Sequence, residues 1–541
     1  MITIQGKGVS AGVGVGPLYF YRRATAEIKR YTVEDTDAEW HRFKGAQTGA
    51  VEQLGVLAEQ ARKEAGDEAA MLFETHQMMA EDLDYEEAIE DRILNQKMNA
   101  EAAVSDTAEQ FADMFASMDD AYMQARAADV KDVSQRIISI LCGIVQGGIA
   151  SDVPVLLCAD DLAPSETIQL DKTKVLGFIT AGGSGSSHTA ILARTLGIPA
   201  IVGMGDALRP ELEGRSAIAD GSTGALVIDP DDDTRDRLLK KRDEQLRLQR
   251  LLETLKGQEN VTKDGKTIRI YCNIGSPEDV HAVQVNDGGG IGLFRSEFLY
   301  LNTSDYPTED EQFTAYKQVL SDMEGKEVII RTLDIGADKQ VGYFDMPPED
   351  NPALGLRAIR LCLTRPILFQ TQLCAILRAS RYGNVGIMFP MVTGPDELHR
   401  LKEALADAED VLIARGKRFG PYRVGVMIET PAAVFMSGEL AGEVDFFSIG
   451  TNDLTQYLLA MDRQNPNLAP FCDPHHPAVL RAIRQTVERA HQAGCTVGIC
   501  GELAADEALT EAFLRLGVDE LSVAPSRILP LREKIRSLTL G

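Results

Sequence analysis

In the second half of the chain, short apolar runs repeatedly end on a chemically reactive residue. Most are followed by a charged or helix-like segment before the next run begins. Catalytic groups at the C-terminal ends of successive parallel strands are typical of a (β/α)8 barrel. Two arginines, two carboxylates, an amide and a thiol in one mouth favour an anionic substrate held with a metal ion. These runs are GIGLFR ending at Arg295, EVIIR at Arg331, RVGVMIE at Glu429, FFSIGTND at Asn452 and Asp453, and TVGIC at Cys500.

From Lys263 onward the runs follow one another as the strands of a barrel would, over roughly 280 residues, within the range of that fold. The main alternative is an open doubly wound sheet. The number of strands and the spread of polar residues over many of them favour the barrel. A long gap between the third and fourth strands is expected to hold loops and helices over the mouth. The eight predicted strands are Thr267–Ile274, Gly290–Arg295, Glu327–Arg331, Val385–Pro390, Arg423–Glu429, Phe446–Gly450, Thr496–Cys500 and Glu520–Val523.

Length and composition restrict the class of protein. At 541 residues the chain is too long for one core, so several domains are expected. A net charge of -27 disfavours general binding to nucleic acid or anionic membranes, and no apolar run reaches membrane-spanning length. Eight cysteines without a C-x-x-C pair fit reduced thiols better than a disulfide scaffold. With no signal peptide visible at the N-terminus, a cytoplasmic location is expected.

The first half changes character several times. Residues 1–22 are rich in glycine and β-branched or aromatic residues and predict strands and turns. From about 33 to 143 glycine and proline are rare and apolar residues recur at helical spacing, which predicts an inserted bundle of helices. Residues 147–230 return to strands, predicted in VPVLLCA, KVLGFIT, IPAIVG and GALVID. The charged segment 231–257 predicts a solvated linker helix before a barrel over 260–541.

The segment GGSGSSHTAILARTLGIPAIVG is a second chemical feature, because it carries His188 in a loop of glycines and hydroxyl residues. The following stretch is helix-like and closes at Gly197, which places His188 near a helix N-terminus, where an anion is favoured. A phosphate on the imidazole would be stabilised there. The segment matches neither the P-loop nor the dinucleotide-binding pattern. The alternative is an ordinary loop with a surface histidine.

This segment closely resembles the phosphohistidine loop of the Enzyme I family of the bacterial sugar phosphotransferase system, the phosphoenolpyruvate–protein phosphotransferases. Blocks in the second half resemble that family's phosphoenolpyruvate site: GLFRSEFLY, IIRTLDIGADK, NPALGLRAIR, MIETPAA, FSIGTNDLTQYLLAMDR and GICGELA. The match covers nearly the whole chain in the family's domain order. The family loop usually reads Gly-Gly-Arg-Thr-Ser-His, whereas this chain has Ser184 and Gly185 at the second and third positions. That departure leaves the nucleophile in place and bears on rate or carrier preference.

The resemblance implies a multidomain α/β protein. Residues 1–22 and 147–230 would form a swivelling phosphohistidine domain, and 33–143 an inserted helical domain that binds the carrier. Residues 231–257 would form the linker helix. Residues 260–541 would form the phosphoenolpyruvate-binding barrel, through which the chain dimerises.

The implied reaction transfers a phosphoryl group from phosphoenolpyruvate to His188 and then to a histidine of the carrier protein HPr, releasing pyruvate. Arg295, Arg331 and Arg463 would hold phosphate oxygens through bidentate contacts. Because His188 lies outside the barrel, it would have to swivel into the barrel mouth and out again.

Glu429 and Asp453 would supply hard oxygen ligands to Mg²⁺. Asn452 would donate a hydrogen bond to the phosphate or the substrate carboxylate; its alternative is a turn residue. Cys500 would protonate carbon 3 of enolpyruvate, although a strand cysteine is ordinarily an inert core residue.

The remaining residues that the resemblance nominates are less specific. Lys339 would add a point charge, or be only a solvated loop lysine. Arg357 would bind substrate, or be a helix-surface arginine. Met78 and Arg126 would contact the carrier, although the helix face in FETHQMMAED also reads as bundle core.

Three other hypotheses stay open. A related phosphoenolpyruvate-using synthase or pyruvate phosphate dikinase would carry an extra ATP-grasp domain, which is not expected here. A nitrogen-pathway paralogue would carry an N-terminal sensor domain, and none is expected. A regulatory protein that senses phosphoenolpyruvate without turnover is disfavoured by the complete set of reactive residues.

Overall fold

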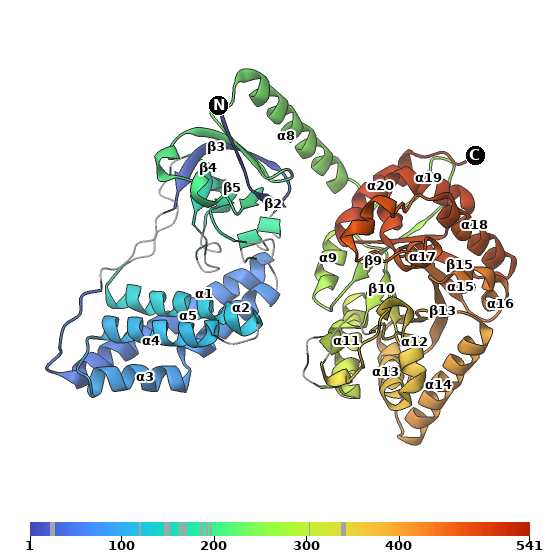
Figure 1. The fold of residues 1–541 in the computed structure, drawn as a ribbon, viewed down its shortest axis with the longest axis horizontal. Coiled ribbons are helices and arrows are strands. Elements are labelled where there is room, and N and C mark those ends of the chain that lie inside the picture. Colours follow the sequence, from blue (N-terminus) through green and yellow to red (C-terminus); the bar gives the residue numbers. More distant parts are fainter. Residues whose placement is uncertain are drawn as a thin grey trace. The chain divides into compact units, whose positions relative to one another are not determined.

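The protein is described by a computed structural model that divides into two units, residues 1–249 and 250–541 (Figure 1). The structure describes residues 1–21, 28–65, 67–117, 121–144, 151, 153–160, 162, 166, 170–183, 187, 189–190, 193–194, 197–301, 303, 305–336 and 342–541. Within those residues, none of the helices combines the length and apolar character that a membrane crossing requires.

The first unit contains a mixed sheet with the strand order β1-β8-β7-β3-β4-β5-β6-β2. Parallel pairing joins β3 to β4, β4 to β5 and β5 to β6, whereas β1, β2, β7 and β8 pair antiparallel with their neighbours. The prediction from the sequence missed β7. The strands are β1 (Ile2–Gln5), β2 (Lys7–Ser10), β3 (Val13–Phe20), β4 (Val155–Ala159), β5 (Val175–Thr180), β6 (Ala200–Val202), β7 (Ser216–Asp220) and β8 (Ala225–Ile228).

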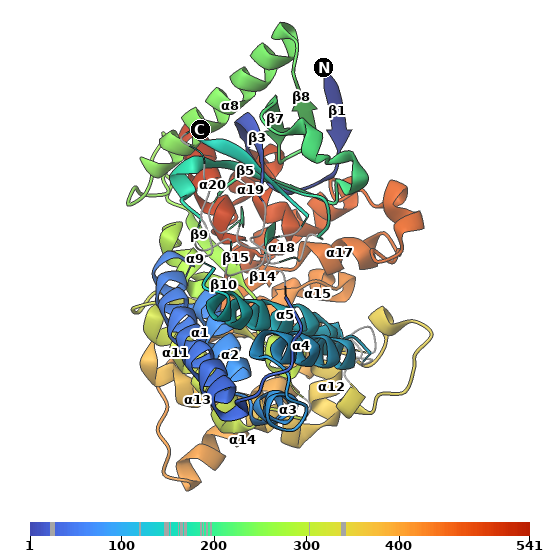
Figure 2. The same ribbon diagram turned by 90° about the vertical axis from the view of Figure 1, so that its left-hand side faces the viewer.

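Helices α1 to α5 lie in the sequence between β3 and β4, two strands that pair with each other. Helix α1 packs alongside α2, and α4 packs alongside α5, as Figure 2 shows for the second pair. Their shared core includes Phe43, Tyr85, Ile89 and Val104, all buried. The helices are α1 (Thr36–Ala65), α2 (Asp67–Ala80), α3 (Leu83–Leu94), α4 (Ala100–Ala116) and α5 (Ala121–Leu141). After the sheet, α8 (Asp232–Glu253) follows.

The second unit contains a closed barrel of parallel strands, so the predicted barrel is confirmed and the open doubly wound sheet is wrong. Closure comes from pairing of the last strand, β16, with the first, β9. Each strand lies within two residues of its predicted bounds. The strands are β9 (Arg269–Ile274), β10 (Ile291–Arg295), β11 (Glu327–Arg331), β12 (Asn384–Phe389), β13 (Tyr422–Ile428), β14 (Phe446–Ile449), β15 (Thr496–Ile499) and β16 (Glu520–Val523).

Helices accompany these strands, as the alternation of apolar and helix-like segments predicts. They are α9 (Asp279–Val285), α10 (Phe298–Leu301), α11 (Glu309–Asp322), α12 (Ile359–Thr364), α13 (Pro366–Ala379), α14 (Pro395–Ala414), α15 (Pro431–Phe435), α16 (Ser437–Ala441), α17 (Thr451–Leu458), α18 (Pro477–Gln492), α19 (Glu507–Leu516) and α20 (Ile528–Ser537).

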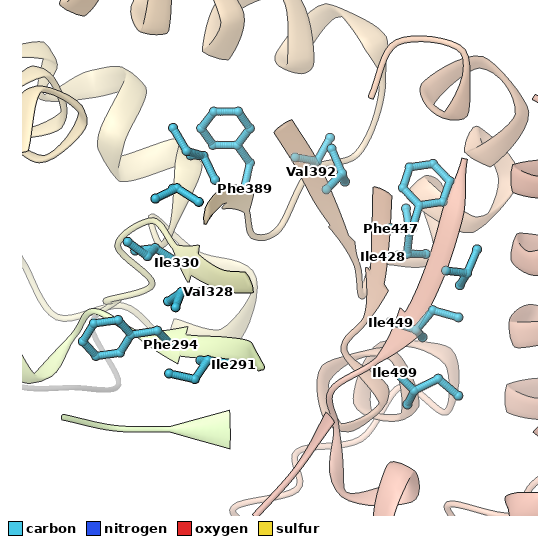
Figure 3. Close-up of a cluster of buried hydrophobic side chains, with 14 of the residues drawn as sticks. Ile291, Phe294, Val328, Ile330, Phe389, Val392, Ile428, Phe447, Ile449 and Ile499 are labelled. Carbon is cyan, nitrogen blue, oxygen red and sulfur yellow. The ribbon is translucent and has the colours of Figure 1, made fainter. Parts of the chain in front are cut away.

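Alternation along each strand sorts the barrel's side chains into two groups. One group packs against the surrounding helices in the largest core of the protein, and Figure 3 shows several of its members, such as Val328, Ile330, Ile428 and Ile449. The other group forms a separate, smaller cluster: Leu293, Ile329, Met388, Met427, Phe446 and Cys500. The reactive strand-end residues Arg331 and Glu429 follow the alternation of this second group.

Charged side chains lie at the opposite, N-terminal ends of the strands. Glu327 on β11 accepts a 2.6 Å hydrogen bond from Arg423 on β13 and another from the Tyr271 hydroxyl at 3.1 Å. Glu520 on β16 is buried 4.0 Å from Arg269. Burial raises the pKa of Glu520 to about 8, with Arg269 opposing the shift and Glu327 adding to it. Charged side chains at this end of a barrel contribute to stability rather than to catalysis.

The raised pKa of Glu520 predicts a pH-dependent stability. Between the ordinary carboxyl pKa of 4.5 and about 8, the folded chain holds a proton that the unfolded chain releases. The free energy of unfolding therefore falls as pH rises through that window. Replacement by the neutral isostere, Glu520→Gln, is expected to remove this fall and to stabilise the barrel at about pH 8 by on the order of 2 kcal/mol. Calorimetric unfolding of both proteins across the window tests it; equal pH dependence contradicts it.

Candidate active site

The reactive strand ends lie next to one another because the strands pair in register. Arg295, the last residue of β10, is the register partner of Arg331, the last residue of β11. On the other side of the barrel, Ile428 pairs with Ile449, and Ile449 with Ile499. Glu429, Gly450 and Cys500 each follow one of these residues directly. One end of the barrel thus brings together the arginines, the carboxylates and the thiol.

Arg331 is buried between two carboxylates. Its guanidinium donates to Glu297 and lies 3.0 Å from Asp334, while Nη1 also contacts the Met427 sulfur at 3.8 Å. Burial works to lower the pKa of Arg331, but Glu297 and Asp334 outweigh it and raise that pKa. Its Nε is buried without a hydrogen-bond partner among the described residues. This cation is therefore permanent and has a donor left for a ligand.

Arg357 lies just before α12 and is only 5% exposed, so its alternative assignment as a helix-surface arginine is wrong. It donates to both oxygens of Asp334, at 2.9 and 3.1 Å, and to the Tyr457 hydroxyl at 3.3 Å. A further contact of 3.7 Å joins Arg357 to Asp453. Burial opposes the charge, but Asp334 and Asp453 raise the pKa of Arg357 above its ordinary value.

Glu429 is buried at the end of β13 and accepts a 2.7 Å hydrogen bond from the backbone N–H of Met391. Met391 has a φ of 59°, in the left-handed region that side chains other than glycine rarely adopt. A residue with strained backbone geometry thus supplies the hydrogen bond that fixes the Glu429 carboxylate. Burial, and then the nearby charges of Asp453 and Asp334, raise the pKa of Glu429 above its ordinary value.

Gly450 allows the next strand to approach Glu429. A Cβ at this position would lie 2.7 Å from Oε2 of Glu429 and 3.0 Å from its Cβ. Asp453 follows on the first turn of α17, buried, with Oδ1 3.7 Å from Arg357 and 3.6 Å from the half-exposed Arg463. The same Oδ1 accepts no hydrogen bond within the described part of the chain.

The two carboxylates fit a small hard cation. No group of three or more His, Cys, Asp or Glu side chains gathers around a possible metal position among the described residues. Mg²⁺, however, commonly takes one or two carboxylates and completes its shell with waters and substrate phosphate oxygens. Glu429, whose charged form is disfavoured by burial and by the nearby carboxylates, and Asp453, whose Oδ1 accepts no hydrogen bond among the described residues, are two such ligands.

Asn452 is held in place by the segment that follows β15. The backbone N–H of Glu502 donates to Oδ1 of Asn452 at 3.0 Å, and Nδ2 of Asn452 points back to the Glu502 carboxylate at 3.4 Å. Gly501 makes this approach possible, because a Cβ there would lie 2.0 Å from Oγ1 of Thr451. Asn452 is therefore oriented by packing and hydrogen bonds at the start of α17, rather than being only a turn residue.

Cys500 is a buried thiol 3.7 Å from the carbonyl oxygen of Ile449. Burial raises its pKa to about 11, although Arg331 and Arg295 act to lower it. A thiol with this pKa is protonated at neutral pH, which suits a proton donor rather than a nucleophile.

Arg295 differs from the other arginines. It is exposed, and no described residue pairs with it or accepts a hydrogen bond from it. Its charge is felt at Cys500, where it lowers the thiol pKa. Arg295 is therefore a solvent-facing cation at the same end of the barrel, ready to receive an anion.

The structure does not place the other predicted site residues in the barrel mouth, and some of them it does not describe. His188 and Lys339, together with Ser184 and Gly185, fall outside the described residues. Met78 on α2 is 65% exposed, whereas the neighbouring Met79 packs against the core of the helices, so the two methionines divide between surface and core. Arg126 on α5 lies 3.7 Å from Asp129.

Reasoning from the sequence missed two carboxylates that shape the site. Asp334 contacts both Arg331 and Arg357, and Glu297 pairs with Arg331. Both follow predicted strands by two or three residues, and both lie in the quoted blocks GLFRSEFLY and IIRTLDIGADK. A search for counter-charges to buried arginines would have singled them out.

Comparison with protein families gives three matches along the chain. Residues 5–126 match the N-terminal domain of phosphoenolpyruvate-utilising enzymes. Residues 152–224 match the mobile domain of these enzymes. Residues 249–540, which include the whole barrel, match their phosphoenolpyruvate-binding domain.

Individual proteins are similar over the whole length. The chain is 41% identical to a phosphoenolpyruvate–protein phosphotransferase of Priestia megaterium, covering 99% of this chain and 94% of that protein. It is also 41% identical to the enzyme of the same name from Bacillus subtilis (strain 168), covering 100% and 95%. Among solved structures, a solution structure of Enzyme I is 34% identical with a TM-score of 0.39, covering 44% of this chain and 98% of that one.

The raised thiol pKa predicts slow alkylation of Cys500. Iodoacetamide reacts with thiolates, so below about pH 11 the rate at Cys500 should rise about tenfold per pH unit, starting from a very low value near neutrality. Peptide mass spectrometry after timed labelling measures the rate at each cysteine. The exposed Cys142 serves as the internal reference. Labelling of Cys500 as fast as Cys142 at neutral pH contradicts the prediction.

Proposed function

The chain belongs to the family of phosphoenolpyruvate-utilising enzymes, and from this premise we propose that it transfers a phosphoryl group from phosphoenolpyruvate to His188 and then to a histidine of an HPr-type carrier protein. It is a phosphotransferase, as its relatives of similar length are named phosphoenolpyruvate–protein phosphotransferases. The finer steps proposed are dependence on Mg²⁺, the identity of the carrier and the release of pyruvate.

One observation carries the proposal: the arginines, two buried acids and a protonated thiol meet at the C-terminal end of a closed barrel. Phosphoryl transfer needs positioning and charge stabilisation more than covalent chemistry from the protein. Three cationic side chains, Arg295, Arg331 and Arg357, are suited to the phosphate and carboxylate of phosphoenolpyruvate, because guanidinium groups bind both in bidentate geometry.

Glu429 and Asp453 would hold the metal ion, and Arg463 and Asn452 would flank it. When bound, Mg²⁺ would supply positive charge that polarises the phosphoryl oxygens and offsets their negative charge. The contact between Asp453 and both Arg357 and Arg463 shows that cations already gather around this carboxylate. Asn452, held in place by Glu502, would donate its free N–H to substrate.

Cys500 would give its proton to carbon 3 of the enolate that forms when the P–O bond breaks, so that pyruvate is released and a thiolate remains. Water or buffer would then restore the proton. The pKa of about 11 keeps the thiol loaded with a proton across the neutral range. The neighbouring Arg331 and Arg295 would stabilise the thiolate briefly formed.

An exposed face of the α1–α2 pair would dock the carrier. Met71 and Met78 are both exposed and lie two helical turns apart, on one face of α2. A hollow on α1 is lined by Gly55 and Val56, and a Cβ at Gly55 would lie 3.0 Å from Gln77, the residue before Met78 on α2. The rim of the hollow is acidic, contributed by Glu52 and Glu59. This combination fits a partner with an apolar patch ringed by basic residues. Dimerisation through the barrel stays a prediction of the family resemblance.

The reaction predicts that wild-type protein, Mg²⁺ and phosphorus-labelled phosphoenolpyruvate give an acid-labile, base-stable label, the behaviour of phosphohistidine. The label is expected to be absent in His188→Ala and after removal of Mg²⁺ by a chelator, and pyruvate formation is expected to fail in Cys500→Ala. Autoradiography and a pyruvate assay follow these outcomes. An unlabelled wild type would favour the alternative that the chain senses phosphoenolpyruvate without turnover. A label that persists in His188→Ala would show that another residue is the acceptor.

The docking face predicts a separation between the two half-reactions. Met78→Asp is expected to raise the KM for the carrier by about tenfold, because a charge replaces an apolar contact at the centre of the interface. Labelling by phosphoenolpyruvate should stay unchanged, since Met78 lies in the other unit from the barrel. The matched control is Met114→Asp, which changes an exposed methionine on α4. Equal effects of the two variants on carrier KM would rule out this face.

A further inference from the structure

Asp334 occupies a position in the mouth that the proposed chemistry leaves without a role. It lies three residues beyond the end of β11 and is only 3% exposed. A buried carboxylate is costly unless it is paired and hydrogen-bonded. Its presence among residues proposed to bind an anionic substrate is unfavourable on charge alone, because it adds a negative charge to the pocket.

Two arginines of the mouth share this one carboxylate. Arg357 donates to both oxygens of Asp334 in a bidentate arrangement, and Nη1 of Arg331 lies 3.0 Å from Oδ2. The backbone reinforces the geometry, because Ala358, next to Arg357, donates its N–H to Ile335 at 3.1 Å. Ala358 has a φ of 51°, so a strained residue brings Arg357 to Asp334.

Other carboxylates compete for the same arginines. Arg357 already lies 3.7 Å from Asp453, and the charges of Asp453 and Glu429 both act on it. The charge of Glu429 also acts on Arg331. Without Asp334, the carboxylates left to attract Arg357 would be Asp453 and Glu429, whose oxygens are those assigned to the metal ion.

We propose that Asp334 is a positioning residue for phosphoenolpyruvate binding, which holds Arg331 and Arg357 together and keeps their guanidinium groups from moving closer to Glu429 and Asp453 than the 3.7 Å at which Arg357 already lies from Asp453. This inference rests on the proposed function. A guanidinium that is hydrogen-bonded along one edge keeps its other edge in a fixed direction. Less conformational entropy is then lost when that edge binds a phosphate. Glu297 cannot replace Asp334, because it pairs with Arg331 alone among the arginines of the mouth.

The test uses the neutral isostere Asp334→Asn in the full chain carrying His188→Ala, which binds substrate but lacks the proposed acceptor. Calorimetric titration with phosphoenolpyruvate in the presence of Mg²⁺ is expected to show at least about tenfold weaker binding. Titration with Mn²⁺ alone, followed by electron paramagnetic resonance, is expected to show weaker binding as well, because Arg357 moves onto the metal carboxylates. Asp334→Glu, which keeps the charge but displaces it, is expected to give a defect in the same direction and serves if the asparagine variant does not fold.

The matched control is Glu327→Gln. It breaks another buried carboxylate–arginine pair, with Arg423, at the opposite end of the same strand. Loss of stability without weaker substrate binding is expected for this control. Equal weakening by both variants would reduce Asp334 to a structural role and overturn the proposal.

A double-mutant cycle with Arg357→Gln separates positioning from simple loss of charge. If Asp334 acts through Arg357, the effect of Asp334→Asn on phosphoenolpyruvate binding is expected to shrink markedly once Arg357 is gone. Full additivity overturns the proposal. Wild-type protein that takes no label from phosphoenolpyruvate would instead refute the proposed function, whereas a labelled wild type with unimpaired binding in Asp334→Asn refutes only this inference.

Discussion

Parallel pairing of β9 with β16 closes the barrel, and the arrangement of the site depends on that closure. In a closed barrel every strand has neighbours on both sides, so each strand has one face toward the interior and one toward the surrounding helices, and successive residues alternate between them. The outward residues pack under the helices, and the character of the inner residues changes along the barrel axis. Charged pairs lie at the N-terminal ends, an apolar layer fills the middle, and the reactive groups are left at the C-terminal ends. An open sheet would not bring β10 and β15 to one mouth.

Buried charge is tolerated in the mouth because each of the two buried arginines has carboxylates beside it. Arg331 has Glu297 and Asp334, and Arg357 has Asp334 and Asp453. Such pairs rarely add net stability, since desolvation offsets much of the attraction. Their value here lies in geometry: planar guanidinium groups are fixed before a ligand arrives. Strain at Met391 and Ala358 points the same way, since both positive-φ residues adjoin groups of the site.

The barrel was predictable because its strands are short apolar runs separated by helix-like segments, and several of these runs end at a polar residue. The strand β7 was missed because SAIAD is mostly small residues with a single β-branched member, so its propensity signal is weak. Burial of Arg357 and the division between Met78 and Met79 depend on tertiary packing, which periodicity alone does not give. Asp334 and Glu297 were overlooked for a related reason. Their arginine partners are distant in the sequence and come close only in the folded chain. Asp334 and Arg357 are 23 residues apart, and Glu297 and Arg331 are 34 residues apart.

If the proposed site is correct, the charge balance of the mouth also couples substrate binding to metal binding. Phosphoenolpyruvate would bring a phosphate and a carboxylate to a mouth that already holds Glu297, Asp334, Glu429 and Asp453. Among the four arginines of the mouth, Arg331 and Arg357 are paired with those acids, whereas Arg295 is exposed and Arg463 lies 3.6 Å from Asp453. A divalent cation on Glu429 and Asp453 would offset the acids that repel the substrate, and the substrate would supply oxygens that two carboxylates alone do not. Each ligand would therefore favour the other, and such a coupling is reciprocal by thermodynamic necessity.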